Sequence, residues 1–381
     1  MTAVVLVSAA ALAYIYGGYY LLLRLAAAGA APAPTSAAGA AATPLPTLTV
    51  LITVRNEEQE IGERLQNVLD CDYDAARLEV LVASDGSTDG TDESVRAFND
   101  KRVRLFRLEG GAGKSAVQNA ALATARGEII VFSDAATRFS GNFLREVVAP
   151  FHSAEVGGVD GHLLFVSGDA ASTLAEAQGH YWRQELRLRE LESALGMLAV
   201  ASGACLAVRA SALRPLPASV GEDCVIPLDV VRAGLRMVHA SGALAYDRLE
   251  SGARDEFRVR VRMTLRNWQG TWLYPELLNP LRHPRLAWAL WSHKLLRWLS
   301  PFFVLAWLLS SLALALSGSA LRAAAVPAAV FAIMAAILIA VPPAREARGW
   351  RIAWSFLVAN AGFALGVMQA LAGRRIVTYR N

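Results

Sequence analysis

The sequence predicts an α/β protein in which a doubly wound parallel sheet is accompanied by membrane-spanning helices. Apolar, β-branched runs alternate with amphipathic segments from residue 48 to residue 133, which is the pattern of parallel strands joined by crossover helices. Carboxylates follow two of these runs, at the strand ends where open α/β sheets bind their ligands. Uncharged stretches of near bilayer-spanning length occur four times, at about 3–23, 300–317, 323–342 and 352–372.

The predicted elements follow one another in a regular order at first. Strands are expected at 48–54, 78–83, 102–107 and 128–133, and helices between them at 57–70, 89–98 and 114–125. After Phe139 the alternation loosens. Strands are then expected at 157–166, 198–208 and 236–246, and helices at 173–195 and 254–273. The segment 282–299, with its three tryptophans among basic residues, is predicted to be an amphipathic helix in the membrane interface, with a soluble surface helix as the alternative.

These elements divide the chain into five parts. Residues 1–26 form a transmembrane anchor, and 27–46 form a linker of Ala, Pro, Ser, Thr and Gly. The α/β domain occupies 47–253, the Arg- and Trp-rich interfacial helices 254–299, and three further spans with a tail 300–381. The first span lacks the positive amino-terminal region of a signal peptide, which favours an anchor.

Charge placement predicts a topology and limits the partners. Nothing basic precedes the first span and Arg24 follows it, so the α/β domain is expected in the cytoplasm of a multi-pass protein of the cell membrane. The loop with Arg345, Arg348 and Arg351 then lies on the cytoplasmic side, as the positive-inside rule expects. The tail with Arg374, Arg375 and Arg380 would lie outside, against that rule.

The net charge of +4 is modest, but arginines cluster from Arg248 to Arg297, which suggests a surface for anionic headgroups or phosphates. No nucleic-acid motif accompanies the cluster, so nucleic acid is not an expected partner. Cys71, Cys205 and Cys224 have no CxxC spacing, which argues against a zinc site or a disulfide framework and favours reduced thiols.

Two polar turns follow the first two strands. In Arg55-Asn56-Glu57 a carboxylate could bind a nucleotide base or ribose, although Glu57 could equally cap the next helix. Asp85, followed by Gly86, could bind a uracil ring or a ribose hydroxyl. The alternative is a turn aspartate that bonds its own backbone.

The glycine-rich run from Gly110 to Ser115 resembles a P-loop at first sight. A Walker motif needs a glycine five positions before Gly113, and Leu108 stands there, so the spacing excludes that motif. A dinucleotide-binding fingerprint is not supported either, because the acidic residue that would bind the ribose is missing downstream. What remains is a turn that presents Lys114 at a helix amino terminus, where a phosphate could bind. A solvated lysine is the alternative.

Acidic residues mark the candidate metal and base positions. Asp134, beside Ser133 at the end of a buried strand, suits a divalent cation, Mg²⁺ or Mn²⁺, that bridges diphosphate oxygens. Glu222 and Asp223 lie in a Gly-flanked loop before an apolar helix. Adjacent carboxylates often raise one pKa, as a general base needs, although either could be a helix cap.

Taken together, these segments resemble the inverting family 2 glycosyltransferases with a GT-A fold, of the membrane-embedded bacterial type related to chitin-oligosaccharide, poly-N-acetylglucosamine and hyaluronan synthases. The likeness covers about residues 48–300 in order. It implies that the Arg55 and Asp85 segments bind uridine, that Lys114 and Asn119 lie on the diphosphate side, and that Asp134 is the first acid of the DxD motif.

On the acceptor side, the same resemblance implies that residues 201–204 form the acceptor loop. Glu222-Asp223 resembles the end of the TED motif, whose last aspartate, here Asp223, is the general base.

Two motifs depart from the family pattern. Ala136 replaces the second acid of DxD, which weakens the expected metal site. In the QxxRW motif of polymerising synthases, an arginine at Arg262 would put Val259 at the glutamine and Met263 at the tryptophan. Arg266 and Trp268 lie one turn later with similar chemistry in altered order.

The resemblance predicts a membrane-bound inverting glycosyltransferase. It would move a sugar from a nucleoside diphosphate donor, UDP-linked in the first instance, to a hydroxyl of a lipid-linked or saccharide acceptor at the membrane. Processive polysaccharide synthesis is the alternative. It would use an aromatic clamp (Tyr181, Trp182, Trp268) and, with so few spans, a channel assembled by a homo-oligomer. A rival from another class is a membrane transporter or scaffold with an inactive nucleotide-binding domain.

Overall fold

The computed structural model describes residues 1–29, 44–166, 173–248, 253–317, 323, 325–341 and 350–375. Most of the predicted linker, and the loop with Arg345 and Arg348, lie outside these ranges. Within them, one eight-stranded mixed sheet forms the centre of the α/β part. Its strands lie side by side in the order β3 (Val103–Leu108), β2 (Leu78–Asp85), β1 (Leu48–Val54), β4 (Ile129–Asp134), β7 (Leu206–Arg209), β6 (Val156–Val166), β8 (Arg236–Arg248) and β5 (Arg138–Phe139).

The first half of the sheet is parallel, as the alternation predicts. The pairs β1–β2, β2–β3 and β1–β4 are all parallel, and the connecting helices are α3 (Glu58–Leu69), α4 (Thr91–Ala97) and α5 (Lys114–Leu122). Strand β1 lies between β2 and β4, and its Val50, Leu51 and Ile52 are fully buried because both faces of the sheet are covered here. In register, Thr53 lies opposite Asp134 and Val54 opposite Ser84, so β1, β2 and β4 end at the same edge of the sheet.

Antiparallel pairing begins at β7, which joins β4 to β6. The predicted strand 198–208 is wrong over most of its length, because only Leu206–Arg209 pairs with the sheet. Just before β7, the Ser202 amide donates to Asp160 Oδ1 at 2.8 Å, so a side chain takes a hydrogen bond that a strand ladder would use. The segment before β7 is therefore a loop directed at the helix α8 (Glu222–Arg232).

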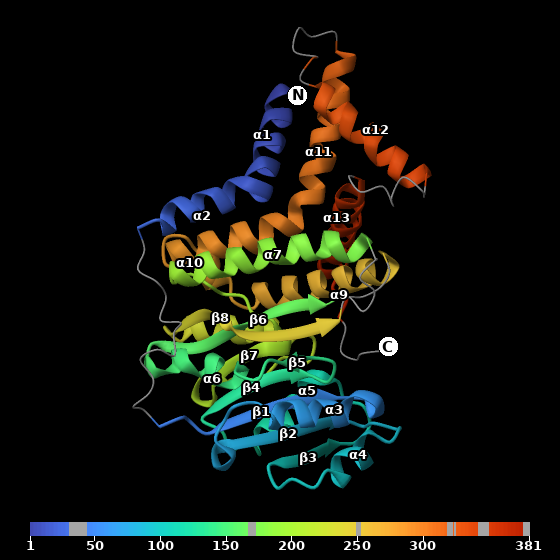
Figure 1. The fold of residues 1–381 in the computed structure, drawn as a ribbon. Helices are drawn as coiled ribbons and strands as arrows, with labels where there is room; N and C mark the ends of the chain where they lie inside the picture. Colours follow the sequence, from blue (N-terminus) through green and yellow to red (C-terminus); the bar gives the residue numbers. More distant parts are fainter. Residues whose placement is uncertain are drawn as a thin grey trace.

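Two long helices, α7 (Thr173–Ala194) and α9 (Ala253–Trp272), lie between the sheet and the apolar helices (Figure 1). A buried ion pair attaches α7 to the sheet: Arg189 Nη1 lies 3.2 Å from Asp160 Oδ2 on β6, and both side chains are nearly inaccessible to solvent. The Arg189 guanidinium and the hydrogen bonds to Asp160 hold the pKa of this carboxyl below its usual range, against the effect of burial.

Three described helices are long and apolar enough to cross a membrane: Thr2–Ala27, Pro284–Leu316 and Ile352–Leu371. The expectation of about four spans is therefore wrong for the described residues. The predicted span at 323–342 corresponds to α12 (Val326–Ala340), which has 15 residues and therefore a length of about 22 Å. This is shorter than a hydrocarbon core of about 30 Å. The helix ends at Ala340, just before Pro342 and Pro343, which cannot continue it.

The predicted interfacial segment 282–299 is not a separate helix. It comprises α10 (Pro284–Ala289), a π-helical turn (Leu290–Leu295) and the start of α11 (Leu296–Leu316), which form one helical run of 33 residues. His293, Lys294 and Trp298 are each at least nine-tenths buried, so these side chains face the protein rather than headgroups or water. Their surroundings, described below, show why.

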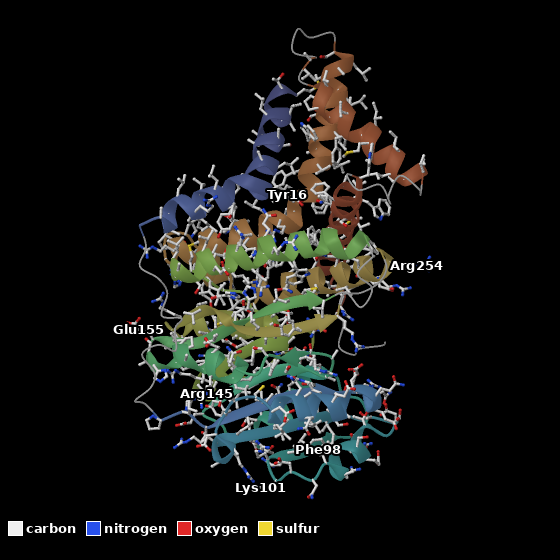
Figure 2. The ribbon with its side chains drawn as sticks, viewed as in Figure 1. Tyr16, Phe98, Lys101, Arg145, Glu155 and Arg254 are labelled. Atoms are coloured by element: carbon white, nitrogen blue, oxygen red, sulfur yellow. The ribbon has the colours of Figure 1, made fainter. Side chains whose placement is uncertain are left out.

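The amino-terminal span bends at a second π-helical turn, Tyr14–Gly18, between α1 (Thr2–Ala13) and α2 (Tyr19–Ala27). Figure 2 shows Tyr16 among these helices, far from Phe98 and Lys101 at the opposite end of the molecule. The carboxy-terminal helix α13 (Trp350–Leu371) packs along α9, where Gly362 and Gly366 allow close approach to Arg260 and Thr264. The apolar helices are therefore in direct contact with the layer that covers the sheet.

Candidate active site

A hollow of about 560 Å³ lies at the sheet edge where β1, β2 and β4 end. We call it the donor hollow. Seven of the residues singled out from the sequence line it: Arg55, Asn56, Glu57, Asp85, Lys114, Asp134 and Arg262. Six come from strand ends and the turns that follow, and Arg262 comes from α9, which closes the hollow from the side of the apolar helices.

The two turns that border this hollow are tied together by Asn56. Its backbone has a positive φ of 57°, a conformation that asparagine tolerates better than most residues. Its Oδ1 accepts a hydrogen bond from the backbone N–H of Thr88 at 2.8 Å, and its backbone N–H donates to Ser87 Oγ at 3.2 Å. The turn after β1 is therefore fixed against the turn after β2.

Asp85 is buried, and its carboxylate holds the glycine-rich turn. Both carboxylate oxygens accept from the Gly113 amide, at 3.0 and 3.1 Å, and Arg55 Nη1 lies 3.9 Å from Oδ2. The bonded amide is 28 residues away, so the alternative of a turn aspartate bonding its own turn is not what the structure shows. Next to it, Gly86 has φ +66°, and a Cβ there would lie 3.0 Å from the Gly111 nitrogen.

Lys114 joins the donor side to the proposed base. Its Nζ lies 2.7 Å from Asp134 Oδ1 and 2.7 Å from Glu222 Oε1. The lysine is mostly buried, Glu222 is buried and Asp134 is partly exposed, so this is not the solvated lysine of the alternative interpretation. One cation thus fixes the end of β4 and the amino terminus of α8 relative to each other.

Asp223 faces a second, smaller hollow of about 110 Å³, which we call the acceptor hollow. Its other charged lining residues come from α7, α9, the π-helical turn and the start of α11: Glu185, Arg189, Arg260, His293, Lys294 and Arg297. Arg262 lines the donor hollow and Met263, the next residue of α9, lines the acceptor hollow. The two hollows therefore adjoin at α9 and at the Glu222-Asp223 pair.

Besides Glu222 and Arg266, four predicted site residues lie outside the linings of both hollows. The side-chain amide of Asn119 donates to the Leu216 carbonyl at 2.9 Å and accepts from the Leu216 N–H at 2.8 Å. Asn119 therefore holds a loop in place. The Ser133 hydroxyl is buried, donating to Ala204 O and accepting from Arg64. Trp268 packs against Trp272 and Trp298. The fourth, Gly86, shapes the turn described above.

Arg266 is also absent from the lining of both hollows, yet it lies beside Asp223. A Cβ built on Gly221 would meet Asp223 Oδ1, and it would lie 3.3 Å from Arg266 Nη2. Trp182 lines the acceptor hollow, where it packs on Phe165 at a ring distance of 4.6 Å. The side chain of Tyr181, the other expected clamp residue of α7, is outside the described residues.

Two residues near the site were not predicted from the sequence. Asp247, at the end of β8, has its pKa raised to about 6, first by burial and then by the negative charge of Asp134. Lys294 is buried in the lining of the acceptor hollow, and its Nζ lies 3.5 Å from Asn267 Oδ1. Neither stands in a recognisable motif, because each reaches the site only through the packing of distant elements.

The donor hollow has oxygen ligands suited to Mg²⁺ or Mn²⁺. Asp134 presents a partly exposed carboxylate to it, and the Glu57 carboxyl is close enough that Asp134 contributes to raising its pKa, after burial and Glu60. Ala136 adds no ligand, and Lys114 occupies one side of Asp134. The residues present therefore fit a cation held jointly by Asp134 and a diphosphate.

A different group of possible metal ligands, His162, Glu190 and His239, has its ligand atoms within 4.8 Å of one another. His162 Nδ1 lies 3.1 Å from His239 Nε2, and His239 Nδ1 lies 2.9 Å from Asp160 Oδ2. Both rings thus belong to a hydrogen-bonded chain that ends on Asp160. This chain lies on β6, β8 and α7, apart from the lining of the donor hollow.

Comparison with solved structures supports the fold class. A mannosyltransferase from Pyrobaculum calidifontis, solved with GDP-mannose and Mn²⁺, superimposes with a TM-score of 0.69 over 98% of this chain and 100% of its own, at 23% identity. The fold is therefore of the GT-A type, as predicted, with accompanying apolar helices.

Sequence comparison gives the family. Residues 49–215 match the profile of Glycosyl transferase family 2. An N-acetylglucosaminyltransferase of Bradyrhizobium diazoefficiens is 25% identical over 62% of this chain and 52% of its own length. A β-monoglucosyldiacylglycerol synthase of a Nostoc species is 28% identical over 36% of this chain and 28% of its own length. The chain thus spans only about half the length of the first of these relatives.

The raised pKa of Asp247 generates a prediction about stability and pH. A carboxyl whose pKa is higher in the folded than in the unfolded state destabilises the fold once it is ionised, and protonation relieves this as pH falls from about 6 to about 4. We expect Asp247→Asn to raise the free energy of unfolding by about 1–2 kcal/mol near pH 8 and by much less near pH 4.5, because the group is partly exposed.

Thermal unfolding in detergent at the two pH values measures this difference. The exposed Glu155, at the edge of the molecule in Figure 2, supplies the control Glu155→Gln, which should change neither value appreciably. An equal increase in the free energy of unfolding by Asp247→Asn at both pH values would contradict a raised pKa for Asp247.

Proposed function

We propose that this protein is a membrane-bound inverting glycosyltransferase that moves a sugar from a nucleoside diphosphate donor to an acceptor hydroxyl. The observation that carries the proposal is the Lys114 bridge, which sets the Asp134 end of the donor hollow against the Glu222-Asp223 pair. Donor phosphates and the acceptor base would thereby lie in neighbouring hollows. A UDP-linked sugar is the first donor to test.

Asp223 is the proposed general base. Its carboxylate faces the acceptor hollow, where it would take the proton of the acceptor hydroxyl. The resulting oxygen attacks the anomeric carbon from the face opposite the leaving diphosphate, so the configuration inverts. Glu222 is buried against Lys114, which makes it a residue that positions the loop rather than a second base.

Cationic side chains would stabilise the leaving diphosphate. Lys114 and Arg262 line the donor hollow, and positive groups aimed at developing negative charge lower the barrier most in a site shielded from water. A divalent cation at Asp134, when bound, would neutralise further charge on the same diphosphate oxygens. Arg55, Asn56, Glu57 and Asp85 would bind the nucleoside.

We place the protein in the cell membrane with the sheet in the cytoplasm. Three described helices are long and apolar enough to span a bilayer. Arg24, just after the first uncharged stretch, supports a cytoplasmic sheet. The Nostoc relative is named as a synthase of monoglucosyldiacylglycerol, a glycolipid, which is compatible with an acceptor at the membrane.

The first prediction concerns the base. Asp223→Asn should keep the fold and nucleotide binding while lowering turnover by about two to four powers of ten, the usual worth of a general base. Turnover is measured as release of nucleoside diphosphate by purified protein in nanodiscs. The control is Asp255→Asn, which removes a half-exposed carboxylate on α9. Unchanged turnover in the Asp223 variant would exclude the assignment, and nucleotide binding without any turnover in the unmodified protein would favour the transporter or scaffold.

The second prediction concerns the metal. Because Asp134 is the one acid that the resemblance assigns to the cation, we expect chelator to abolish turnover and Mn²⁺ to bind weakly unless nucleoside diphosphate is present. Calorimetry with and without the nucleotide checks this. Tight Mn²⁺ binding to the free protein that persists in Asp134→Asn would show that other ligands hold the ion.

The third prediction concerns product length. The altered segment around Arg262 has Met263 where an indole would stack, and the described spans are too few for one chain to enclose a channel. We therefore expect transfer of one or a few sugars. Mass analysis of products made with a labelled donor decides this, and a high-molecular-weight product would return the protein to the processive synthases.

A further inference from the structure

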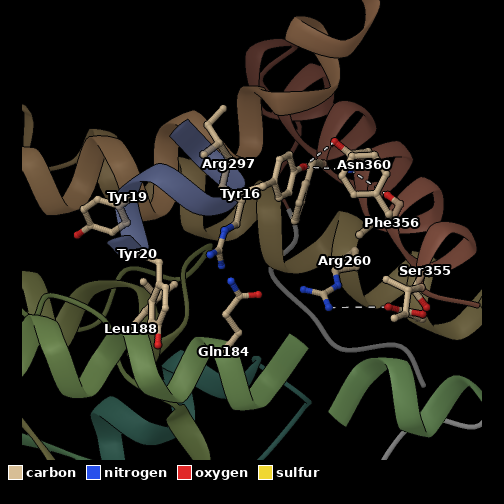
Figure 3. Close-up of a pocket in the computed structure, with 15 residues that line it drawn as sticks. Tyr16, Tyr19, Tyr20, Gln184, Leu188, Arg260, Arg297, Ser355, Phe356 and Asn360 are labelled. Carbon is tan, nitrogen blue, oxygen red and sulfur yellow. Dashed lines mark hydrogen bonds and ion pairs between the residues drawn. The ribbon is translucent and has the colours of Figure 1, made fainter. Parts of the chain in front are cut away.

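We infer that the acceptor is a lipid that carries a phosphate, with its hydrocarbon chain bound in a pocket between the apolar helices and its phosphate beside Lys294. This inference rests on the proposed function and names the substrate class of the same site. It starts from a cavity of about 200 Å³ shown in Figure 3, which we call the tyrosine pocket because Tyr16, Tyr19 and Tyr20 line one side.

The walls of the tyrosine pocket come from both ends of the chain. Tyr16 belongs to the π-helical turn of the first span, Leu188 to α7, and Phe356 and Phe363 to α13. Two of the three bilayer-length helices, Thr2–Ala27 and Ile352–Leu371, therefore contribute to it. Its volume equals that of about seven water-sized groups, enough for a stretch of hydrocarbon chain.

The polar groups of the wall near Tyr16 bond one another. The Tyr16 hydroxyl donates to Ser300 Oγ at 2.8 Å, Ser300 donates to Asn360 Oδ1 at 2.7 Å, and the rings of Tyr16 and Phe356 lie 5.1 Å apart. These bonds leave ring faces and aliphatic groups of this wall to contact an occupant, while Glu256, Arg260, Arg297 and Ser355 add polar groups elsewhere in the lining. A site of this kind favours an apolar chain over a sugar, which needs many hydrogen-bond partners.

The tyrosine pocket adjoins the acceptor hollow. Arg260, Arg297 and Phe363 line both cavities. In Figure 3 the guanidinium groups of Arg260 and Arg297 are turned toward the middle of the pocket from α9 and α11. A molecule with its chain in the pocket would thus have its head at the Asp223 side.

Charge in the acceptor hollow favours an anionic head. Its lining holds three arginines and a lysine, Arg189, Arg260, Arg297 and Lys294, against two carboxylates, Glu185 and Asp223. Arg189 and Arg260 also pair with Asp160 and Glu256, outside this lining. The carboxylates are partly matched already, since Glu185 pairs with Arg297 at 2.7 Å and with Arg189 at 3.3 Å.

Lys294 is the cation least compensated. It is 6% exposed, and among the described residues its Nζ has one hydrogen-bond partner, Asn267 Oδ1, at 3.5 Å. A buried ammonium without a close counter-ion is costly unless something binds it. A phosphate in the hollow would supply that counter-ion next to Asp223.

The test measures lipid binding to the full-length protein in detergent, apart from turnover. Three probes separate the parts of the ligand: oleoyl lysophosphatidate has chain and phosphate, monoolein has the chain with an uncharged head, and glycerol 3-phosphate has the phosphate alone. We expect lysophosphatidate to bind at least about tenfold more tightly than either of the others, because only it fills both cavities.

Matched variants locate the site. Ala359 lines the tyrosine pocket, whereas Ala361 is exposed on the same helix. Ala359→Phe should weaken lysophosphatidate binding about tenfold or more, the worth of roughly two displaced methylenes, and Ala361→Phe should not. Lys294→Met should weaken lysophosphatidate binding but leave monoolein unchanged.

Two results would overturn the inference: equal binding by the Ala359 and Ala361 variants, or glycerol 3-phosphate binding as tightly as lysophosphatidate. Transfer to a soluble saccharide that Ala359→Phe leaves intact, with no specific lipid binding, would refute the pocket while the glycosyltransferase stands. Specific lipid binding without sugar transfer to any acceptor would refute the proposed function instead.

Discussion

The arrangement of the site depends on one mostly buried cation. Lys114 lies at the amino terminus of α5, and its Nζ contacts Asp134 at the end of β4 and Glu222 at the start of α8. Removing a cation shared by two carboxylates leaves both uncompensated, with Glu222 buried, which is far more costly than losing a surface ion pair. The relative position of Asp134 and Asp223 therefore depends on this one side chain. Asp85 supports it by binding the Gly113 amide just before Lys114.

The helices that cover the sheet are also part of the site. Arg262 and Arg266 come from α9, and Lys294 comes from the helical run that continues into the second bilayer-length helix. The charged residues of this layer are buried and paired: Glu185 bonds His293 and Arg297, and Glu192 bonds His293 and Tyr19. Such a network fixes the apolar helices to the layer that covers the sheet, because separating them would leave several buried charges without partners. A site assembled in this way couples the acceptor hollow to the membrane side of the molecule.

Prediction from the sequence succeeded where local pattern is sufficient. The strands 48–54, 78–83, 102–107 and 128–133 and the long helices correspond to observed elements within a few residues. It failed where a distant partner decides. The strand expected at 198–208 is mostly a loop because Asp160 binds the Ser202 amide, and Asn119, assigned to the diphosphate side, instead clamps the backbone of Leu216. Of the tryptophans expected at the membrane interface, Trp298 is buried against neighbouring helices, whereas Trp291 is exposed.

The sequence by itself determined the parallel half-sheet, its ligand-binding edge and the order of Asp85, Lys114, Asp134 and Asp223 along the chain. These follow from residue periodicity and from the rule that parallel strands present their carboxyl ends at one edge. Only the tertiary structure decided which of these groups touch and which other residues join them. The Lys114 bridge, the raised pKa of Asp247 and the burial of Lys294 all arise from contacts between residues far apart in the chain. Their energies depend on burial and on distances of a few ångströms, and neither is encoded in local spacing.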